Sequence, residues 1–283
     1  MQERQWIKGK ICLVTGASSG IGLATSWQLA KLGATVVMIA RDDERGQAGL
    51  AKVIEKSGNT NTQLLMADFA SLAQVRSLAL KVKAQFPALH ILINNAAIIP
   101  PKRETSEDGN EMQFQVNHLA PFLLTNLLLP LMKTSQPARI INVSSMVHSW
   151  GTIDFDYLQS KRNYDPTGVY SMTKLANILF TTQLHRDLKN TSITVNSLHP
   201  GVINTRLNNI YMGSSGPGNA DEVELERGAA TTVYLAASED VTTTSGKYFA
   251  NLQEKQPSAS SQDAETARHL WKISAEMVGL SPN

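Results

Sequence analysis

Two residues four positions apart, Tyr170 and Lys174, have the chemistry for proton transfer. On a helix, positions i and i+4 lie on one face, so these side chains would project together. A phenol with a pKa near ~10 exchanges protons poorly at neutral pH, and a neighbouring ammonium group lowers that pKa. The pair is therefore a candidate for acid–base chemistry on a substrate oxygen. The alternative is an ordinary pair of solvated helical side chains.

Polar residues also follow two apolar runs farther along the chain. Ser144 and Ser145 follow the run at 139–143, and Asn95 follows the run at 91–94. The carboxyl ends of parallel strands face a ligand crevice, so these side chains are candidates for contact with a ligand. Serine and asparagine also end strands in ordinary turns. Asn117 lies on the long helical stretch that follows, where a structural or exposed role is the alternative.

A glycine-rich turn, T-G-A-S-S-G-I-G at 15–22, joins an apolar run to a helical pattern. Glycine allows a tight turn and close approach of a ligand, and a helix start offers free N–H groups to a pyrophosphate. We assign Gly16 to the turn, Gly20 to the close approach and Gly22 to packing of helix on strand. Because the spacing differs from G-x-G-x-x-G, a plain turn is the alternative.

Short β-branched runs alternate with longer helical patterns, and this order would position the polar residues. Helical spacing at 75–86 follows Ser71, a predicted N-cap, and Gly58 ends the preceding helix. The alternation predicts an α/β fold with a doubly wound, parallel, seven-stranded sheet of the Rossmann type. The expected strands are 11–15, 35–40, 63–67, 91–94, 139–144, 193–198 and 247–250.

We interpret the chain, residues 1–283, as a single domain with its core at 9–251. The segment 203–224 is the predicted substrate loop, and its stretch 212–220 is rich in Gly, Ser and Pro. A plain surface loop is the alternative for that stretch. Residues 260–280 are expected to form a C-terminal helix that docks on the core.

Composition limits the function classes. The net charge is +2 and basic residues form no block, which argues against a nucleic-acid partner or an anionic membrane. The single cysteine, Cys12, cannot form an internal disulfide, and the N-terminus lacks an apolar leader, so we expect a cytoplasmic protein. The apolar window 119–132 is too short and interrupted to span a bilayer, so no membrane anchor is expected. No metal site is expected.

Taken in order, these motifs resemble the short-chain dehydrogenase/reductase family in its single-domain branch. T-G-x-x-x-G-x-G is met at 15–22, N-N-A-G is met at 94–97 except that Ala97 replaces the glycine, and a P-G turn is met at 200–201. The resemblance implies an active site of Asn117, Ser145, Tyr170 and Lys174.

Three further stretches are similar to the retinol dehydrogenase-like reductases, namely 117–125, 174–180 and 245–249. The long gap from Ser145 to Tyr170 is also similar, and it favours Ser145 over Ser144 as the catalytic serine. The segment 208–224 departs from that subgroup, which puts retinoid specificity in doubt.

The resemblance implies a nicotinamide cofactor. NAD-preferring relatives carry an acidic residue at the end of the second strand, where this chain has Ala40 followed by Arg41. A small residue and a guanidinium suit a 2′-phosphate, so we predict NADP(H) over NAD(H). The alternative is that Arg41 pairs with Asp42, Asp43 or a neighbouring helix. The predicted cofactor-binding residues are Gly16, Ser18, Ser19, Gly20, Ile21, Gly22, Arg41, Asp68, Asn95, Ala96, Tyr170, Lys174, Pro200, Gly201, Val202 and Thr205.

The implied activity is hydride transfer between the nicotinamide of NADP(H) and a carbonyl or alcohol of a lipophilic substrate. Tyr170 would protonate the alkoxide, Ser145 would donate a hydrogen bond to it, and Lys174 would lower the pKa of Tyr170 and hold the ribose. Asn117 would position a water. The alternatives are a catalytically silent NADP(H)-binding regulatory protein and a different reaction, such as epimerisation or double-bond reduction.

The substrate pocket and the assembly are less defined by the sequence. His148, Trp150, Leu207 and Tyr211 are candidates for the pocket wall, and simple packing is the alternative for each. The resemblance implies a homodimer or homotetramer formed through the Tyr170 helix and a helix at 227–237.

Overall fold

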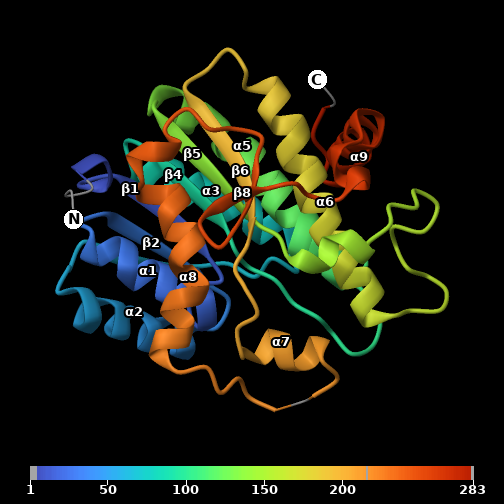
Figure 1. Ribbon diagram of the computed structural model, residues 1–283, viewed down its shortest axis with the longest axis horizontal. Helices are drawn as coiled ribbons and strands as arrows, with labels where there is room; N and C mark the ends of the chain where they lie inside the picture. Colours follow the sequence, from blue (N-terminus) through green and yellow to red (C-terminus); the bar gives the residue numbers. More distant parts are fainter. Residues whose placement is uncertain (1–4, 215, 282–283) are drawn as a thin grey trace.

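An eight-stranded sheet lies between two layers of helices in the computed structural model, which describes residues 5–214 and 216–281 (Figure 1). The strand order is β3-β2-β1-β4-β5-β6-β7-β8, so the chain reverses direction across the sheet between β1 and β4. In such sheets the ligand crevice opens at this reversal. The strands are β1 (Ile11–Thr15), β2 (Thr35–Ala40), β3 (Thr62–Met66), β4 (Ile91–Asn94), β5 (Ala138–Val143), β6 (Ile193–His199), β7 (Tyr248–Ala250) and β8 (Gln253–Lys255).

The seven predicted strands are present, each within one residue of its expected bounds, and they pair in parallel. The count of seven was one short, because β8 adds an eighth strand that pairs antiparallel with β7. All three residues of β8 are exposed and polar, so no apolar run marks this strand in the sequence.

Successive side chains of β1 show why both faces of the sheet are covered. Leu13 belongs to one apolar core, and its neighbours Cys12 and Val14 belong to the other. This follows from the two-residue repeat of a strand. Helices α3 (Leu72–Gln85), α5 (Ala120–Thr134) and α6 (Pro166–Asp187) cover the first face; α1 (Gly20–Lys31), α2 (Asp43–Ser57) and α8 (Glu222–Ala237) cover the second.

The remaining helices extend these layers. The predicted C-terminal helix is α9 (Ala264–Met277), which packs on α6, and α7 (Arg206–Tyr211) lies apart from both layers (Figure 1). The short helix α4 (Met112–Phe114) runs into a π-helical turn, Gln115–Leu119, and this turn leads into α5. A 3₁₀ turn, Met146–Trp150, follows β5.

The positions of both predicted helix ends are confirmed. Gly58 ends α2 with a left-handed φ of 67° and donates its N–H to the Ile54 carbonyl. Ser71 is the N-cap residue of α3, as predicted, but its side chain accepts no capping hydrogen bond. The carboxylate of Asp108 accepts the Leu72 N–H instead at 2.8 Å.

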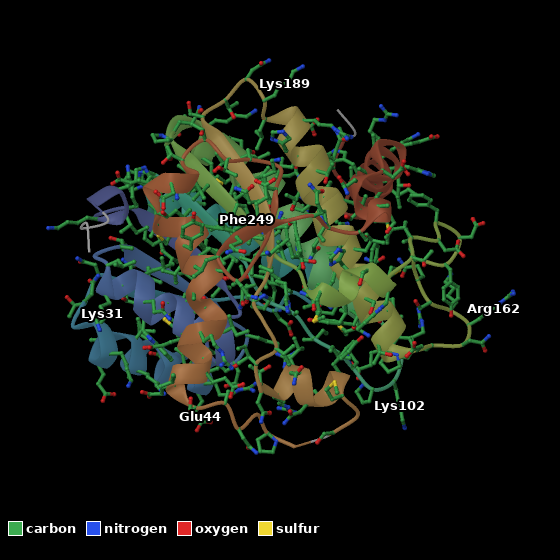
Figure 2. The ribbon with its side chains drawn as sticks, viewed as in Figure 1. Lys31, Glu44, Lys102, Arg162, Lys189 and Phe249 are labelled. Carbon is green, nitrogen blue, oxygen red and sulfur yellow. The ribbon has the colours of Figure 1, made fainter. Side chains whose placement is uncertain are left out.

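Charged side chains lie mostly at the periphery. Figure 2 shows Lys31, Glu44, Lys102, Arg162 and Lys189 at the rim of the molecule, whereas Phe249 of β7 lies among the central elements. Cys12 is fully buried, and burial raises the pKa of its thiol, as expected for a structural cysteine. Every helix in the described part of the chain is too short or too polar to cross a membrane.

Candidate active site

The glycine turn after β1 has the conformation that its glycines predict. Gly16 and Gly20 have φ values of 65° and 56°, in the left-handed region that favours glycine. A Cβ on Gly22 would lie 2.3 Å from the Gly16 carbonyl oxygen, so Gly22 lets the start of α1 pack against the turn. The close approach of a ligand at Gly20 stays a prediction. A Cβ there would meet only the Thr205 side chain at 3.7 Å, so its backbone angle rather than crowding favours glycine.

The start of α1 forms a cradle of donors. Ser19 is the N-cap residue, and its exposed side chain makes no capping hydrogen bond. The first N–H groups of a helix have no partner within that helix, and they lie at the positive end of its dipole. Ser18 and Ile21, which flank this cradle, are half-buried. The geometry fits a pyrophosphate at the N-terminus of α1.

Asn95 joins this turn to the end of β4. Its Nδ2 donates to the Thr15 carbonyl oxygen at 2.8 Å, and the backbone N–H groups of Asn95 and Ala96 donate to Thr15 Oγ1 at 2.9 and 3.0 Å. Ala96 also fits closely, since a Cβ on Gly16 would lie 2.9 Å from its Cα. Sequence reasoning missed Thr15, although a threonine directly before the glycine turn was a visible signal.

Arg41 is exposed at the end of β2, and no ion pair among the described residues involves it. Asp42 instead caps α2 by accepting the Arg45 N–H at 2.9 Å, and its carboxylate pairs with the Arg45 guanidinium at 3.4 Å. These hydrogen bonds from Arg45, together with the charge of its guanidinium, hold the pKa of Asp42 below its usual value. The alternative that Arg41 is taken up by a neighbouring carboxylate is therefore not observed. Asp68 follows β3 and accepts the Ala70 N–H at 3.0 Å.

The two serines after β5 are used differently. The buried Ser144 hydroxyl donates to the Lys174 carbonyl oxygen at 2.7 Å, so it is engaged within the core. Ser145 is half-buried, and its hydroxyl oxygen accepts only a long 3.4 Å hydrogen bond from the Val147 N–H. The Ser145 hydroxyl proton is thus free for a ligand.

The 3₁₀ turn that carries Ser145 meets α6 closely. A Cβ on Gly151, which ends the turn, would lie 2.4 Å from the Ser171 carbonyl oxygen of α6. Val147 of the turn and Tyr170 of α6 belong to one small apolar cluster. The fold therefore brings the Ser145 turn and the Tyr170 helix together. The family resemblance had implied that these two residues share one site.

Tyr170 and Lys174 share a face of α6 and are both buried. The Lys174 Nζ lies 5.2 Å from the centroid of the Tyr170 ring and donates to the Val143 carbonyl oxygen at 3.0 Å. Burial lowers the pKa of Lys174 to about 7. Burial also raises the pKa of Tyr170, whereas the sequence analysis predicted that Lys174 would lower it. The correction follows from desolvation, which disfavours both charged forms and outweighs any attraction between the ammonium and a phenolate.

Asn117 lies in the π-helical turn and is fully buried. Its Oδ1 accepts the Ile98 N–H at 2.8 Å, and its Nδ2 donates to the Ile98 carbonyl at 3.0 Å and to Thr173 Oγ1 at 3.2 Å. The side chain therefore ties the segment after β4 to α6, one residue before Lys174. A π-helical turn inside a helix is frequent at functional sites.

Helix α7 supplies apolar side chains to the cluster around Tyr170. Leu207, Ile210 and Tyr211 pack there beside Ala97, the residue that stands where the family motif has glycine. The ring centroids of Tyr170 and Tyr211 are 5.6 Å apart, and Tyr170 is 7% exposed. Two of the four pocket candidates, Leu207 and Tyr211, thus lie beside Tyr170.

The other two pocket candidates, His148 and Trp150, lie on the 3₁₀ turn after Ser145 and are not among the residues of this apolar cluster. Trp150 is 66% exposed, and His148 is buried with both ring nitrogens in hydrogen bonds. Packing was the alternative for each position; it describes His148, whereas the exposure of Trp150 fits neither assignment.

The segment after β6 turns sharply at Gly201, whose φ is 93°. Pro200 and Gly201 are half-buried, Val202 is exposed, and Thr205 is the N-cap of α7 through its side chain. Pro200, Gly201 and Val202 also line a pocket of about 330 Å³ that faces α8 and includes none of the four candidate catalytic residues.

Comparison with known proteins adds a family and two sets of relatives. The model of the family described as short chain dehydrogenase matches residues 10–212. Retinol dehydrogenase 13 of Homo sapiens is 41% identical, with 97% of this chain and 86% of the relative covered. Retinol dehydrogenase 14 of Mus musculus is also 41% identical, with 96% and 86% covered.

Solved structures give the same fold. An uncharacterised protein from Mycobacterium paratuberculosis matches with a TM-score of 0.81 at 31% identity, covering 98% of this chain and 96% of that one. A short chain dehydrogenase from Shigella flexneri, complexed with NADP, matches with a TM-score of 0.68 at 23% identity, covering 87% and 98%. At that identity the second likeness shows the fold alone.

Proposed function

Because the chain belongs to the short-chain dehydrogenase family, we propose that it transfers hydride between NADP(H) and a carbonyl or alcohol of a lipophilic substrate. One observation carries the proposal: the free hydroxyl of Ser145 lies on a turn packed against α6, the helix that bears the buried Tyr170–Lys174 pair. Hydroxyls that meet at the carboxyl edge of a parallel sheet are suited to a substrate oxygen.

The dinucleotide would be held by the residues that line this edge. The pyrophosphate would lie on the cradle of Gly16, Ser18, Ser19, Gly20, Ile21 and Gly22, supported by the positive φ at Gly16 and Gly20. Asp68 follows β3, and Asn95 and Ala96 follow β4, at the same edge of the sheet and on the proposed adenosine side of the site. Pro200, Gly201, Val202 and Thr205 follow β6 on the nicotinamide side.

Arg41 supports NADP(H) over NAD(H). Its guanidinium is exposed at the end of β2 and is not paired with a carboxylate of the described chain, and Ala40 beside it leaves space. A guanidinium matches a phosphate through two parallel hydrogen bonds. The ribose 2′-phosphate of NADP(H) is the group that this side chain would bind.

The bound nicotinamide supplies or accepts the hydride. In the reductive direction, Tyr170 gives its proton to the oxygen on which negative charge develops, and its raised pKa keeps that proton in place at neutral pH. Ser145 donates a hydrogen bond to the same oxygen, which stabilises charge where it forms. Lys174 would hold the ribose. Asn117, whose side chain is engaged by Ile98 and Thr173, would brace the helix that carries Lys174, and the water predicted beside it stays a prediction.

The lipophilic substrate is argued from the cover over Tyr170. Ile99, Val147, Leu207 and Ile210 surround that ring with apolar surface. The segment 203–224, which includes α7, is therefore the proposed substrate loop. Because the curated relatives are named retinol dehydrogenases, retinal belongs among the substrates to test first.

The proposal is tested by NADPH consumption with a panel of aldehydes and ketones that includes retinal and steroids, with NADH in parallel. We expect turnover with NADPH, and loss of that turnover in Tyr170→Phe while NADPH still binds with wild-type affinity. Phenylalanine keeps the ring and removes only the proton donor. Turnover that survives in Tyr170→Phe would contradict the acid role. NADPH binding without turnover on every substrate would favour the silent regulatory protein.

A further inference from the structure

His148 connects the Ser145 turn to a segment 110 positions away in the chain. The ring is 4% exposed and uses both nitrogens. Nδ1 lies 2.7 Å from the Ser145 carbonyl oxygen, and Nε2 lies 3.0 Å from the Ser258 backbone nitrogen. Ser258 lies between β8 and α9, directly before a 3₁₀ turn, Ala259–Gln262, that packs on α6.

These two contacts fix the tautomer of the ring. A backbone N–H can only donate, so Nε2 must accept the hydrogen bond from Ser258 and carries no proton. The one proton of the neutral ring is then on Nδ1, which donates to the Ser145 carbonyl. Burial lowers the pKa of His148, which also favours the neutral ring.

We propose that His148 is a positioning residue for catalysis, held in place by Ser258, that fixes the backbone of Ser145 so that its hydroxyl faces the substrate oxygen. The inference rests on the role proposed above for Ser145. It makes the segment between β8 and α9 a working part of the active site, acting through the bond from Ser258 to His148.

The hydrogen bonds around Ser145 explain why this restraint matters. Its carbonyl accepts both His148 Nδ1 and the His148 N–H, the latter at 3.2 Å, so most of its support within the turn comes from one residue. Its hydroxyl contributes only the long bond to Val147. The ring of Tyr248, a residue of β7, packs on the His148 ring with the two centroids 5.0 Å apart. A misplacement of about 1 Å at a reacting group can cost about a hundredfold in rate.

A pair of substitutions at Ser258 isolates the bond to His148. Ser258 has φ −59° and ψ 151°, angles that proline adopts without strain. Ser258→Pro and Ser258→Ala both lose the hydroxyl, which contacts Ser260 Oγ at 3.1 Å, but only Ser258→Pro loses the N–H that His148 accepts. We expect kcat of Ser258→Pro to fall about tenfold or more below that of Ser258→Ala, with the KM for NADPH unchanged.

A double-mutant cycle tests whether the loss acts through His148. His148→Phe keeps a ring against Tyr248 and removes both hydrogen bonds. In the His148→Phe background, Ser258→Pro and Ser258→Ala should have equal kcat, because the bond that distinguishes them is already absent. A further drop in kcat for Ser258→Pro in that background would overturn the proposal, as would equal kcat for the two variants in the wild-type background.

Hydrogen exchange followed by mass spectrometry tests the restraint without any substrate. Exchange of the segment 144–151 should be faster in Ser258→Pro than in Ser258→Ala, with exchange of β1 unchanged. Unchanged exchange at 144–151 would overturn the restraint even in an active enzyme. If the wild-type protein turns over no substrate, the proposed function fails and the exchange result alone decides the link between Ser258 and Ser145.

Discussion

Lys174 is a buried cation that the folded protein stabilises poorly. Its ammonium donates to one backbone carbonyl, and burial alone lowers its pKa from 10.5 to about 7. The cost of burying this charge is a cost in folding stability. Residues of active sites commonly lower the folding stability of the free protein because their positions serve activity.

This cost predicts how stability depends on pH. Between about pH 7 and pH 10.5 the unfolded chain keeps the Lys174 proton that the folded protein has lost, so raising the pH stabilises the fold. Relative to Lys174→Met, the cofactor-free wild type should gain up to about 1.4 kcal/mol of unfolding free energy per pH unit in this window. Urea unfolding at several pH values measures it.

The matched control for this series is Lys189→Met, which changes an exposed lysine. That variant should run parallel to the wild type across the same pH range. Equal pH dependence of the wild type and Lys174→Met would show that Lys174 keeps an ordinary pKa.

Arg41 allows a prediction about cofactor preference. Arg41→Ala should raise the KM for NADPH by about tenfold to a hundredfold, since it removes a charge-assisted contact to the 2′-phosphate. The KM for NADH should stay within about twofold, because NADH has no phosphate at that position. Lys31→Ala makes the same charge change at the opposite end of α1 from the glycine turn and should alter neither value. Parallel increases in both KM values would remove the 2′-phosphate from the role of Arg41.

At the scale of elements, a buried histidine joins α9 to the helices of the candidate site. His118 Nδ1 lies 3.3 Å from Asn177 Oδ1 of α6, and Nε2 lies 2.9 Å from Ser274 Oγ of α9. The ring stacks on Phe114 with centroids 5.2 Å apart. Burial lowers the pKa of His118 to about 4, so the ring is neutral at pH 7. With Nδ1 donating to the amide oxygen, Nε2 accepts the hydroxyl proton of Ser274.

Loss of the Ser274 hydroxyl should therefore weaken the docking of α9. Ser274→Ala leaves a buried ring nitrogen without a donor, which costs about 1–3 kcal/mol of unfolding free energy. Lys272→Ala on the exposed side of the same helix should change stability by no more than about 0.5 kcal/mol. Urea unfolding of the two variants compares them, and equal stabilities would mean that the hydrogen bond contributes nothing.

Elements with a strong apolar pattern were predictable from the sequence, and those without one were not. The seven parallel strands were predictable from short apolar runs such as 35–40, whose side chains are almost all buried in the sheet. The strand β8 is three exposed polar residues, and the π-helical turn keeps the same buried character as the helix around it. The N-cap position of α3 at Ser71 was predictable, but the acceptor of the Leu72 N–H was not, because Asp108 comes from 36 positions away.

The candidate site divides in the same way. The sequence favoured Ser145 over Ser144 as the catalytic serine, and this stays a prediction; it is supported by the Ser144 hydroxyl, which is engaged by the Lys174 carbonyl oxygen. The role of His148 could not be predicted, since its second partner is a backbone N–H that any residue at 258 except proline would supply. The pKa of Tyr170 depends on burial by α7, which local spacing does not report.

At the scale of the whole molecule, Arg139 holds several distant segments together from β5. Its guanidinium donates to the Leu235 and Ser238 carbonyls at the end of α8, at 2.9 and 2.7 Å. It also lies 3.9 Å from the centroid of the Trp6 ring. The negative end of the α8 dipole and the aromatic face stabilise this cation, which forms no salt bridge among the described residues. Burial lowers its pKa only to about 10, so it stays charged at neutral pH.

Lysine should not replace this arginine. Arg139→Lys keeps the charge but loses the planar fork that reaches both carbonyls and stacks on Trp6, so it should cost about 1–3 kcal/mol of unfolding free energy. Arg162→Lys, an exposed position, is the matched control and should leave stability unchanged within about 0.5 kcal/mol. Chemical denaturation provides the comparison. Wild-type stability in Arg139→Lys would mean that charge alone suffices there.

The short strand β8 has a consequence for behaviour at high concentration. Without it, the sheet would end at β7, whose Tyr248 and Phe249 are apolar and whose free backbone groups could pair with another chain. The three residues of β8 cover that edge with Gln, Glu and Lys side chains, and Glu254 is held by Lys247 at 2.9 Å. A strand of a second chain that paired with this edge of the sheet would have to bury the charges of Glu254 and Lys255. The chain thus carries, nine residues before its last helix, a guard against self-templated aggregation.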